Sequence, residues 1–336
     1  MSSPSSQTGK SNWPRDSFGR VEVSTWFWWF GFPLVAAVAA IVAAVALGPL
    51  PTGRLSVVIY AAQDQVYAEP ILQQFTKETG IKVRAVYDSE AVKTVGLANR
   101  LLAERSRPQC DVFWGNEELR TRQLAAQQVF RATNGWAAFG FRSRRLAVRP
   151  PADPSAPPSL RDLTNAAWRG RVSLAYPLFG TTATHFLALR QRWGASAWET
   201  WCRALAANRP FLEEGNSLVV KRLARGEAWI GLTDCDDLAV AWRERLEAGT
   251  PMPLNAETLL MQNTVAVIRG APHPAAAQRL FEFLQRRQVI AQLVASGALE
   301  GIETREVTTP TLQPDWEALL RDLDAATAKL REIFLR

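Results

Sequence analysis

The chain has 336 residues, of which 47% are hydrophobic and 21% are charged, so its composition excludes a disordered or fibrous protein and predicts a globular one. The length predicts two domains rather than one. The formal net charge is +7, but the arginines are scattered rather than clustered with aromatic residues, so we expect no nucleic-acid partner. The three cysteines, Cys110, Cys202 and Cys235, have no metal-ligand spacing and form no disulfide framework.

The N-terminal segment predicts a location outside the cytoplasm. Residues 1–25 read as a cytoplasmic tail that carries several basic residues, and residues 26–50 are almost wholly apolar. A stretch of this length spans a bilayer, and tryptophans at its start suit the membrane interface. The length favours an uncleaved signal-anchor over a removed signal peptide. We therefore expect a transmembrane helix that tethers the body to the periplasmic or extracellular side of the cell membrane.

The first part of the body alternates apolar strands with helical patterns. Strands are predicted over 55–60, 81–86 and 111–114, with one helix that ends at Gly80 and another over 91–105. This alternation predicts a parallel sheet with helical crossovers. Acids and amides follow each strand, and in such sheets ligands bind outside the carboxyl ends of the strands. The candidate ligand-binding residues here are Asp64, Asp88, Glu90, Asn116 and Glu117.

The second part begins with a strand over 144–148 and a proline-rich linker over 150–159. A further strand within 168–175 leads into a turn that contains Gly180, Thr181 and Thr182. Hydroxyls and free backbone N–H groups at a helix start suit an anion or a carbonyl group, and they equally suit plain helix capping. The residues that follow predict a helix over 193–205 with Trp198 and Trp201 in the core, Asn216 pointing into the cleft, and Ser217 as the N-cap of a helix over 218–225.

The most informative stretch is GEAWIGLTDCDD, residues 226–237. An apolar strand over 228–232 ends in three aspartates before a helix that starts near Leu238. The acids fit a site for a cationic or polar ligand, and they also fit an acidic first helical turn. We take Asp234 and Asp236 as ligand-binding. Beyond them we expect a strand over 259–268 that the Asn263-Thr264 pair interrupts, and helices over 275–284, 289–296 and 315–335.

Motifs of catalysis are missing. The chain has two histidines, His185 and His273, and shows no HExxH, P-loop or GxGxxG motif. No arrangement of serine, histidine and aspartate suggests a nucleophile. We therefore expect no enzymatic activity and no cofactor.

The body from about Leu55 to Arg305 resembles the extracellular solute-binding proteins of ABC importers, of the ferric-iron-binding type. The resemblance rests on the stretches SVVIYAAQDQ, FTKETGIKVRAVY, CDVFWGNE, FRSRRLAVRP, YPLFGTTATHF, EEGNSLVVKRLARGEAWIGLTD and QNTVAVIRGAPHPAAAQRLFEFL. It implies a two-lobe α/β fold of the periplasmic-binding-protein type, with a hinge and a ligand cleft between the lobes. Lobe 1 would comprise 54–143 and 258–305, lobe 2 would comprise 144–257, and a C-terminal helix would occupy 306–336.

The resemblance also implies ligands and partners. Members of the family deliver a bound solute to an ABC permease, and we expect a monomer that does the same. The family's metal ligands correspond by position to Asp64, to Glu117 or its neighbour Asn116, and to Asp236. The family's tyrosine pair is replaced here by Cys235 and Asp236, and the turns that hold its anion are retained at Gly180-Thr181-Thr182 and Asn216-Ser217.

These features leave the ligand open. An oxygen-rich cleft suits Fe³⁺ or another hard metal ion, alone or with an anion. Carboxylates also suit an organic cation such as a thiamine-like solute or a polyamine, whereas the threonine turn suits a phosphonate. A membrane-tethered sensor built on the same fold is the other class of function that the sequence allows.

Overall fold

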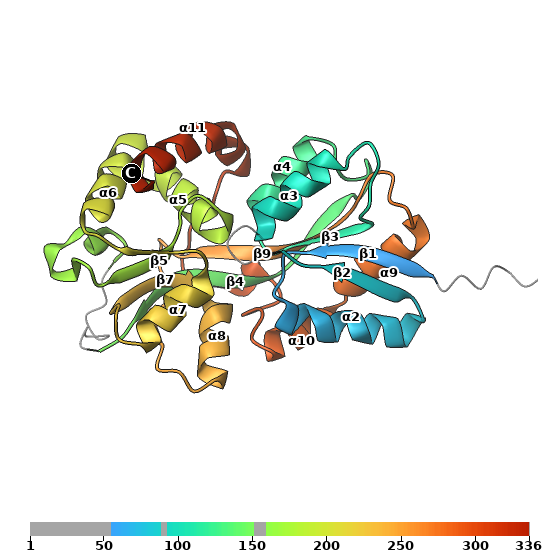
Figure 1. The fold of residues 1–336 in the computed structure, drawn as a ribbon, viewed down its shortest axis with the longest axis horizontal. Coiled ribbons are helices and arrows are strands. Elements are labelled where there is room, and N and C mark those ends of the chain that lie inside the picture. The colour runs from blue at the N-terminus through green and yellow to red at the C-terminus, as the bar shows by residue number, and fades with distance from the viewer. Residues whose placement is uncertain (1–54, 89–92, 151–158, 336) are drawn as a thin grey trace, which may run out of the picture. The chain divides into compact units, whose positions relative to one another are not determined.

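The computed structural model describes residues 55–88, 93–150 and 159–335 (Figure 1). The predicted tail and apolar stretch over 1–50, Glu90 and most of the proline-rich linker lie outside these residues. The strands are β1 (Ser56–Ala61), β2 (Lys82–Val86), β3 (Val112–Gly115), β4 (Trp136–Val148), β5 (Val172–Ala175), β6 (Phe211–Glu213), β7 (Ile230–Asp234), β8 (Thr250–Pro251) and β9 (Leu259–Val267). The α-helices are α2 (Gln65–Thr79), α3 (Lys93–Ala103), α4 (Glu118–Ala126), α5 (Gly180–Trp193), α6 (Ala195–Ala207), α7 (Asn216–Ala224), α8 (Cys235–Arg243), α9 (Pro274–Leu284), α10 (Arg287–Ala295) and α11 (Trp316–Phe334).

One mixed sheet joins the two parts of the body. Its strand order is β2-β1-β3-β9-β4-β7-β5-β6, and β8 pairs with β4. The predicted parallel arrangement of the first three strands is confirmed, because β1 pairs with both β2 and β3 in parallel. Strands β7, β5 and β6 form a second parallel set. The long strands β4 and β9 pair antiparallel from Trp136–Ala266 to Arg144–Leu259 and connect the two sets.

Helices cover both faces of this sheet. Helices α3, α4, α5, α6 and α11 lie on one face, and α2, α7, α8, α9 and α10 lie on the other (Figure 1). The buried apolar side chains form four clusters, and each set of parallel strands has one cluster on each face. Each set of strands therefore has a core of its own. That 54–143 with 258–305 and 144–257 act as separate lobes stays a prediction.

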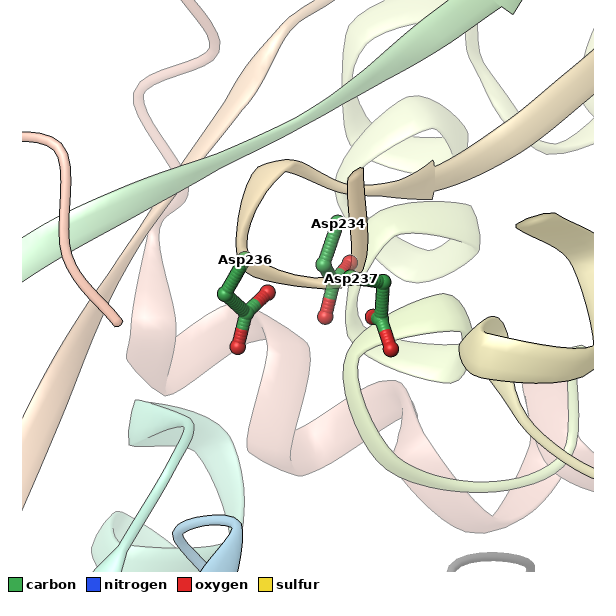
Figure 2. A group of neighbouring side chains, drawn as sticks. All are labelled: Asp234, Asp236 and Asp237. Atoms are coloured by element: carbon green, nitrogen blue, oxygen red, sulfur yellow. The ribbon is translucent and has the colours of Figure 1, made fainter. Parts of the chain in front are cut away.

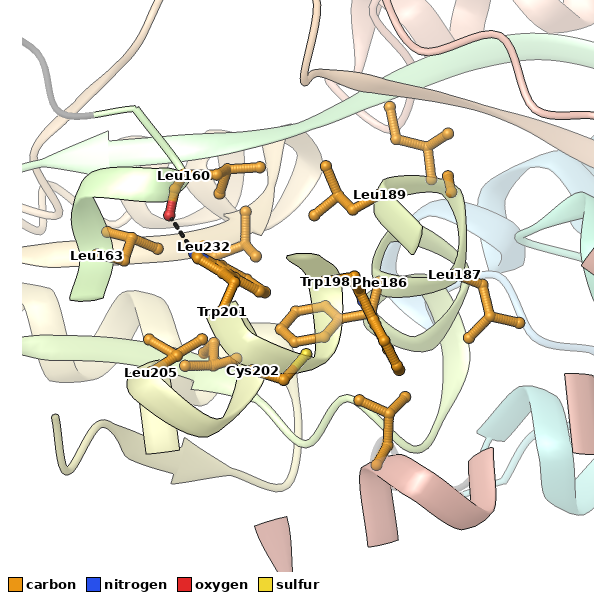
Figure 3. Packing of buried hydrophobic residues seen from close by; sticks show 14 of the residues in the cluster. Leu160, Leu163, Phe186, Leu187, Leu189, Trp198, Trp201, Cys202, Leu205 and Leu232 are labelled. Atoms are coloured by element: carbon orange, nitrogen blue, oxygen red, sulfur yellow. Dashed lines mark hydrogen bonds between the residues drawn. The ribbon is translucent and has the colours of Figure 1, made fainter. Parts of the chain in front are cut away.

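The tryptophans of the second part belong to its core, as predicted. Trp198 and Trp201 are buried among leucines of α5, α6 and the preceding segment (Figure 3). The indole Nε1 of Trp201 donates to the carbonyl of Leu160 at 2.9 Å, so its one polar group is satisfied inside the apolar cluster. The predicted C-terminal helix corresponds to α11, whose apolar face packs on this same cluster.

Three local predictions are wrong at their boundaries. Helix α7 begins at Asn216 with Gly215 as its N-cap, so Ser217 lies inside the helix and does not cap it. Helix α8 begins at Cys235 rather than near Leu238, because the aspartates are accommodated in its first turn. Strand β4 begins at Trp136 rather than at Arg144, since β9 supplies hydrogen-bonding partners along its first half.

Strand β9 is continuous, contrary to the predicted interruption at Asn263-Thr264. Both residues are buried, and each has a polar partner from a distant segment. Asn263 accepts from Arg142 and donates to Gln63 Oε1, whereas the Thr264 hydroxyl bonds to Thr121. Because these contacts satisfy the polar groups, the strand can carry them through the interior.

Among the described residues, none of the helices combines the length and the apolar composition needed to cross a bilayer. The apolar stretch over 26–50, on which the predicted membrane helix rests, lies outside that part of the chain.

Gly140 provides a test of the β4–β9 pairing. The register shifts between Phe139 and Phe141, and Gly140 between them has a φ of +56°. A Cβ at this position would overlap Leu299 and stand 3.1 Å from Ile290 Cγ2. We expect Gly140→Ala to lower the free energy of unfolding by about 2–4 kcal/mol, from left-handed strain and overpacking together.

The matched control is Gly170→Ala, because Gly170 has a φ of +66° but no atom within 4 Å of an added Cβ. It should lose only the strain contribution, about 1 kcal/mol. Urea denaturation measures both values, and equal losses in the two variants would show that packing against Leu299 is unimportant.

Candidate ligand site

Three helices begin at one edge of the sheet, where the parallel strands β5, β6 and β7 end. Helix α5 begins at Gly180, α7 at Asn216 and α8 at Cys235. Strand β5 pairs with β6 and β7 in parallel, so the carboxyl ends of the three strands are neighbours. The first turn of each helix has backbone N–H groups without helical partners and a partial positive charge. This edge therefore favours negative charge.

The negative charge at this edge is the carboxylate of Asp234, a residue that is 2% exposed. Its Oδ1 accepts from Arg144 Nη1 at 2.5 Å. Its Oδ2 accepts from the Thr181 hydroxyl at 2.9 Å and from Asn216 Nδ2 at 3.2 Å. Arg144 Nη1 also lies 3.1 Å from Thr181 Oγ1 and 2.9 Å from Asn216 Oδ1. The structure thus brings together three predicted site residues, and it adds an arginine that the sequence analysis did not select.

A second arginine completes the group. Arg142 and Arg144 stand two residues apart in β4, so both side chains point to the same face of the sheet. They are 1% and 0% exposed. Arg142 Nη2 lies 3.6 Å from Asp234 Oδ2, and its Nε lies 3.4 Å from Asp236 Oδ1. Burial opposes the charge of Arg142, yet Asp236 and Asp234 together raise its pKa. Burial lowers the pKa of Arg144 against the attraction of Asp234.

A signal for these arginines exists in the sequence. In FRSRRLAV, two arginines stand two residues apart in a stretch that becomes apolar at Leu146. Long charged side chains on the inward face of a strand are rare unless they are paired. The pattern therefore indicates buried acidic partners, and Asp234 at the end of β7 and Asp236 in the first turn of α8 supply them.

The three aspartates lie close together at the start of α8. Oxygen atoms of Asp234, Asp236 and Asp237 all lie within 4.8 Å of one another, and the three carboxylates point to the same side of the turn (Figure 2). Hard metal ions prefer such oxygen donors. The guanidinium groups of Arg142 and Arg144 pair with Asp234 and Asp236, so the negative charge of these two carboxylates is balanced within the protein.

Tyr67 of α2 contacts this turn from the first part of the body. Its hydroxyl donates to the main-chain carbonyl of Asp236 at 3.1 Å and accepts from Arg243 Nη2 at 2.8 Å. Burial, and after it the charge of Asp236, raises the pKa of Tyr67, so the phenol stays protonated at neutral pH. Tyr67 thereby connects α2 with the start of α8.

Glu117, predicted as a metal ligand, is the N-cap of α4. Its carboxylate accepts from the backbone N–H groups of Leu119 at 2.8 Å and Arg120 at 3.0 Å, and from the Thr184 hydroxyl at 3.0 Å. Burial raises its pKa, although the charge of Arg120 and these hydrogen bonds oppose the shift. Both carboxylate oxygens are therefore engaged inside the protein. The neighbouring Asn116 is partly buried.

A pocket of about 320 Å³ lies beside the aspartate turn. Its polar lining comes from Asp64, Asp88, Ser217, Asp237 and a few neighbours in the β1–α2 turn, the end of β2, α7 and α8. Its apolar walls are Val66, Tyr87, Val220, Val240, Ala241 and Leu246. Among the predicted residues, Asp64 and Asp88 line this pocket, whereas Glu117, Gly180, Thr181, Thr182, Asn216, Asp234 and Asp236 do not.

The charges that line this pocket are mostly negative. Among the lining residues that the structure describes, Asp64, Asp88, Asp237 and Glu244 carry carboxylates, and Lys221 carries an ammonium group. Lys221 and Glu244 were not predicted as site residues, because on α7 and α8 they resemble ordinary solvent-exposed charges. The balance of charge favours a cation over an anion in this space.

Comparison with known protein families shows where this chain belongs. The sequence model of the bacterial extracellular solute-binding protein family matches residues 55–298. The chain belongs to this family. Its members bind solutes and catalyse no reaction, in agreement with the predicted lack of enzymatic activity.

A curated protein is similar to this chain in sequence, and solved structures are similar to it in fold. An Fe(3+)-binding periplasmic protein of Serratia marcescens is 31% identical over 196 residues, which is 52% of this chain and 56% of the relative. Iron-bound HitA from Pseudomonas aeruginosa superposes with a TM-score of 0.70 at 20% identity, over 83% of this chain and 99% of its own. AfuA from Actinobacillus pleuropneumoniae, solved with fructose-6-phosphate, has a TM-score of 0.70 at 16% identity over 84% and 99%. The predicted α/β fold of the periplasmic-binding-protein type is thereby confirmed.

Removing Arg144 should be costly for stability. Arg144→Met leaves the buried Asp234 carboxylate without its nearest cation, and we expect a loss of about 3–5 kcal/mol in the free energy of unfolding. Arg149→Met is the control, because the ion pair of Arg149 within the described residues is with the exposed Glu247 at 3.6 Å, and its loss should cost about 1 kcal/mol or less. Similar losses in urea denaturation of the two variants would contradict this account of the buried pair.

His185 predicts a pH dependence of stability. Its Nε2 donates to the Glu257 carbonyl at 2.8 Å, and burial, with a further contribution from Arg144, lowers the pKa of His185 to about 3. The unfolded chain binds a proton near pH 6.5 that the folded chain does not bind until about pH 3. Stability from this group is therefore complete above pH 6.5 and declines as the pH falls toward 3.

Between pH 7 and pH 5 the decline from His185 should be about 2 kcal/mol. His185→Gln keeps a donor for Glu257 and removes the titrating group, so the variant should lose that much less stability than the parent over this range. Parallel pH profiles of the two proteins in urea denaturation would show that His185 is protonated in the folded state.

Proposed function

We propose that this protein captures a small cationic solute outside the cytoplasm and delivers it to an ABC permease. The observation that carries the proposal is the pocket beside the aspartate turn, whose described lining residues include four with a carboxylate and one with an ammonium group. The pocket is lined by the β1–α2 turn and the end of β2 on one side and by α7 and α8 on the other. This placement supports a cleft between two lobes, with β4 and β9 as the strands that would bend on closure.

A hard metal ion is the first candidate for the cation. The relatives named above include an Fe(3+)-binding protein and an iron-bound protein. Asp64, Asp88 and Asp237 offer oxygen donors in one pocket, and Asp236 lies next to it, with a carboxylate oxygen within 4.8 Å of one of Asp237. Asp236, which the sequence predicts as a metal ligand, has its carboxylate beside that of Asp237.

An organic cation is the second candidate, and the size and walls of the pocket favour it. A volume of about 320 Å³ with apolar walls from Tyr87, Val220 and Leu246 is in the range of small-molecule sites and exceeds what a bare ion fills. The Tyr87 ring and the nearby carboxylates would suit a solute that carries a positive charge on an apolar body.

The anion site that the resemblance implies is proposed to be filled by the protein itself. Thr181 and Asn216 donate to the Asp234 carboxylate, and Arg144 pairs with it, so these groups already hold one negative charge. A separate anion or a phosphonate at this turn would have to displace Asp234. We therefore propose that binding of the cation requires no accompanying anion at Gly180, Thr181 and Thr182.

The location of the protein is proposed from the sequence and the family. Residues 26–50 would cross the membrane and tether the body on its outer side, where a permease partner would lie. Fractionation of cells that express the full chain tests this tether, because an uncleaved anchor keeps the protein in the membrane fraction at high salt. Recovery of the body in the soluble fraction would overturn it.

Ligand screening by thermal shift tests the proposed function. Fe³⁺–citrate, Ca²⁺, thiamine, spermidine, a phosphonate and a sugar phosphate are offered to the protein, and a ligand that binds only the folded state raises the melting temperature. A shift with a metal supports the first candidate, and a shift with thiamine or spermidine alone supports the second. A shift with a phosphonate or a sugar phosphate, and with no cation, would overturn the proposal.

Asp237→Asn identifies the pocket as the binding site. The substitution removes one charge from the pocket, and we expect affinity for the cation to fall roughly 10- to 100-fold. Stability should fall by less than about 1 kcal/mol, the contribution of an acid in a first helical turn. Asp324→Asn on the exposed face of α11 is the control, and isothermal titration should show unchanged affinity. Equal affinities in both variants would place the ligand elsewhere.

A further inference from the structure

One end of the sheet in the first part of the body gathers exposed basic residues. Strand β1 begins there at Ser56, which pairs with Lys82 at the start of β2. The segment before β3 lies at the same end, because Val58 N–H donates to Asp111 Oδ2 at 2.7 Å. The end of β9 lies there too, since Ile268 N–H donates to the Asp111 carbonyl at 3.0 Å.

Five cations share this end, which we call the basic end. They are Lys77 at the end of α2, Lys82, Arg105 and Arg107 before β3, and Arg269 after β9. All five are exposed, and within the described ranges none of them forms an ion pair. Arg105 and Arg269 line the same small hollow.

The acids of this end are engaged with other partners. Glu78 pairs with Arg286 at 2.9 Å, and Glu104 pairs with Arg100 at 2.8 Å. Asp111 is buried and accepts from the His273 backbone and ring. The positive charge of the basic end is therefore not neutralised locally, and Leu55, 61% exposed, adds an apolar side chain beside it.

We propose that the basic end rests on the anionic phospholipid surface of the membrane. Two observations select a membrane as the partner. The charge of the five cations complements anionic headgroups, each cation contributing while it lies within a Debye length of the surface. The chain outside the described residues ends at this same place, and four residues separate the apolar stretch 26–50 from Leu55. That connection reaches at most about 18 Å, so a tether would hold the basic end near the headgroups.

The inference rests on the proposed location outside the cytoplasm, and it adds an orientation to it. The basic end lies at the start of β1, whereas Asp64, which lines the ligand pocket, follows the carboxyl end of the same strand. Lipid contact and ligand binding would thus use opposite ends of the same strand. Each can be measured without the other.

Vesicle sedimentation tests the proposal with residues 54–336. This part forms a compact unit with its own cores. The structural match to HitA spans 83% of this chain and 99% of the HitA chain, so a protein of about this extent has the same fold. The vesicles are phosphatidylcholine alone, or phosphatidylcholine with roughly one-third phosphatidylglycerol, at about 0.05 M and about 0.5 M salt. We expect binding only to the anionic vesicles and only at the lower salt concentration.

Two variants with equal net charge separate the basic end from overall charge. Lys82→Gln, Arg105→Gln, Arg107→Gln and Arg269→Gln together remove four cations of the basic end. Arg169→Gln, Arg192→Gln, Arg225→Gln and Arg321→Gln together remove four exposed cations elsewhere. The first variant should lose about tenfold or more in partitioning to anionic vesicles, and the second should bind nearly as the parent does.

Three results would overturn the proposal. In the first, the parent protein fails to bind anionic vesicles at low salt. In the second, both variants lose binding equally, which would reveal a response to net charge alone. In the third, vesicle binding is absent while the first variant impairs solute uptake in cells, which would assign the basic end to a protein partner. A failed ligand screen would leave the vesicle result intact, so failure of the proposed function is recognised separately.

Discussion

The buried pair of Asp234 and Arg144 is the interaction on which the second part of the body depends. An ionised carboxylate inside a protein is stable only when charges and hydrogen bonds replace its water. Here Arg144, Thr181 and Asn216 supply them, and they come from β4, α5 and α7. One carboxylate thus fixes how a strand and three helix starts meet. The same arrangement takes up the polar groups that a ligand would otherwise find at this edge.

The neutral character of this edge shapes the ligand site beside it. Arg142 and Arg144 balance the charge of Asp234 and Asp236, and Glu117 is engaged as a helix cap. The carboxylates that line the pocket include those of Asp64, Asp88 and Asp237. Selectivity in this protein would accordingly depend on a few carboxylates set among apolar walls, rather than on a dense shell of ligands around a metal.

The local pattern of the sequence predicted much of this structure, and distant contacts account for what it missed. The alternation of apolar strands and helices was sufficient for the parallel strands. Thr181, Asn216 and Asp234, each predicted to bind ligand, lie in contact with one another, and their role in binding stays a prediction. No local signal pairs Arg144 with an acid 90 residues away. Asn263 looked like an interruption because its partner Gln63 stands 200 residues earlier. Whether a polar residue is buried inside a strand can be decided only when its hydrogen-bonding partners are known.

The long pairing of β4 with β9 has a consequence for synthesis of the chain. Arg142 hydrogen-bonds to Asn263, and its strand β4 pairs with β9, so neither contact can form until a further 121 residues have been synthesised. At ordinary rates of translation this interval is roughly 6–24 s. During that time an unpaired strand with two inward-facing arginines emerges ahead of the acids that neutralise them. Burial of either arginine before its acidic partners are available would cost several kcal/mol, which disfavours early compaction of this strand.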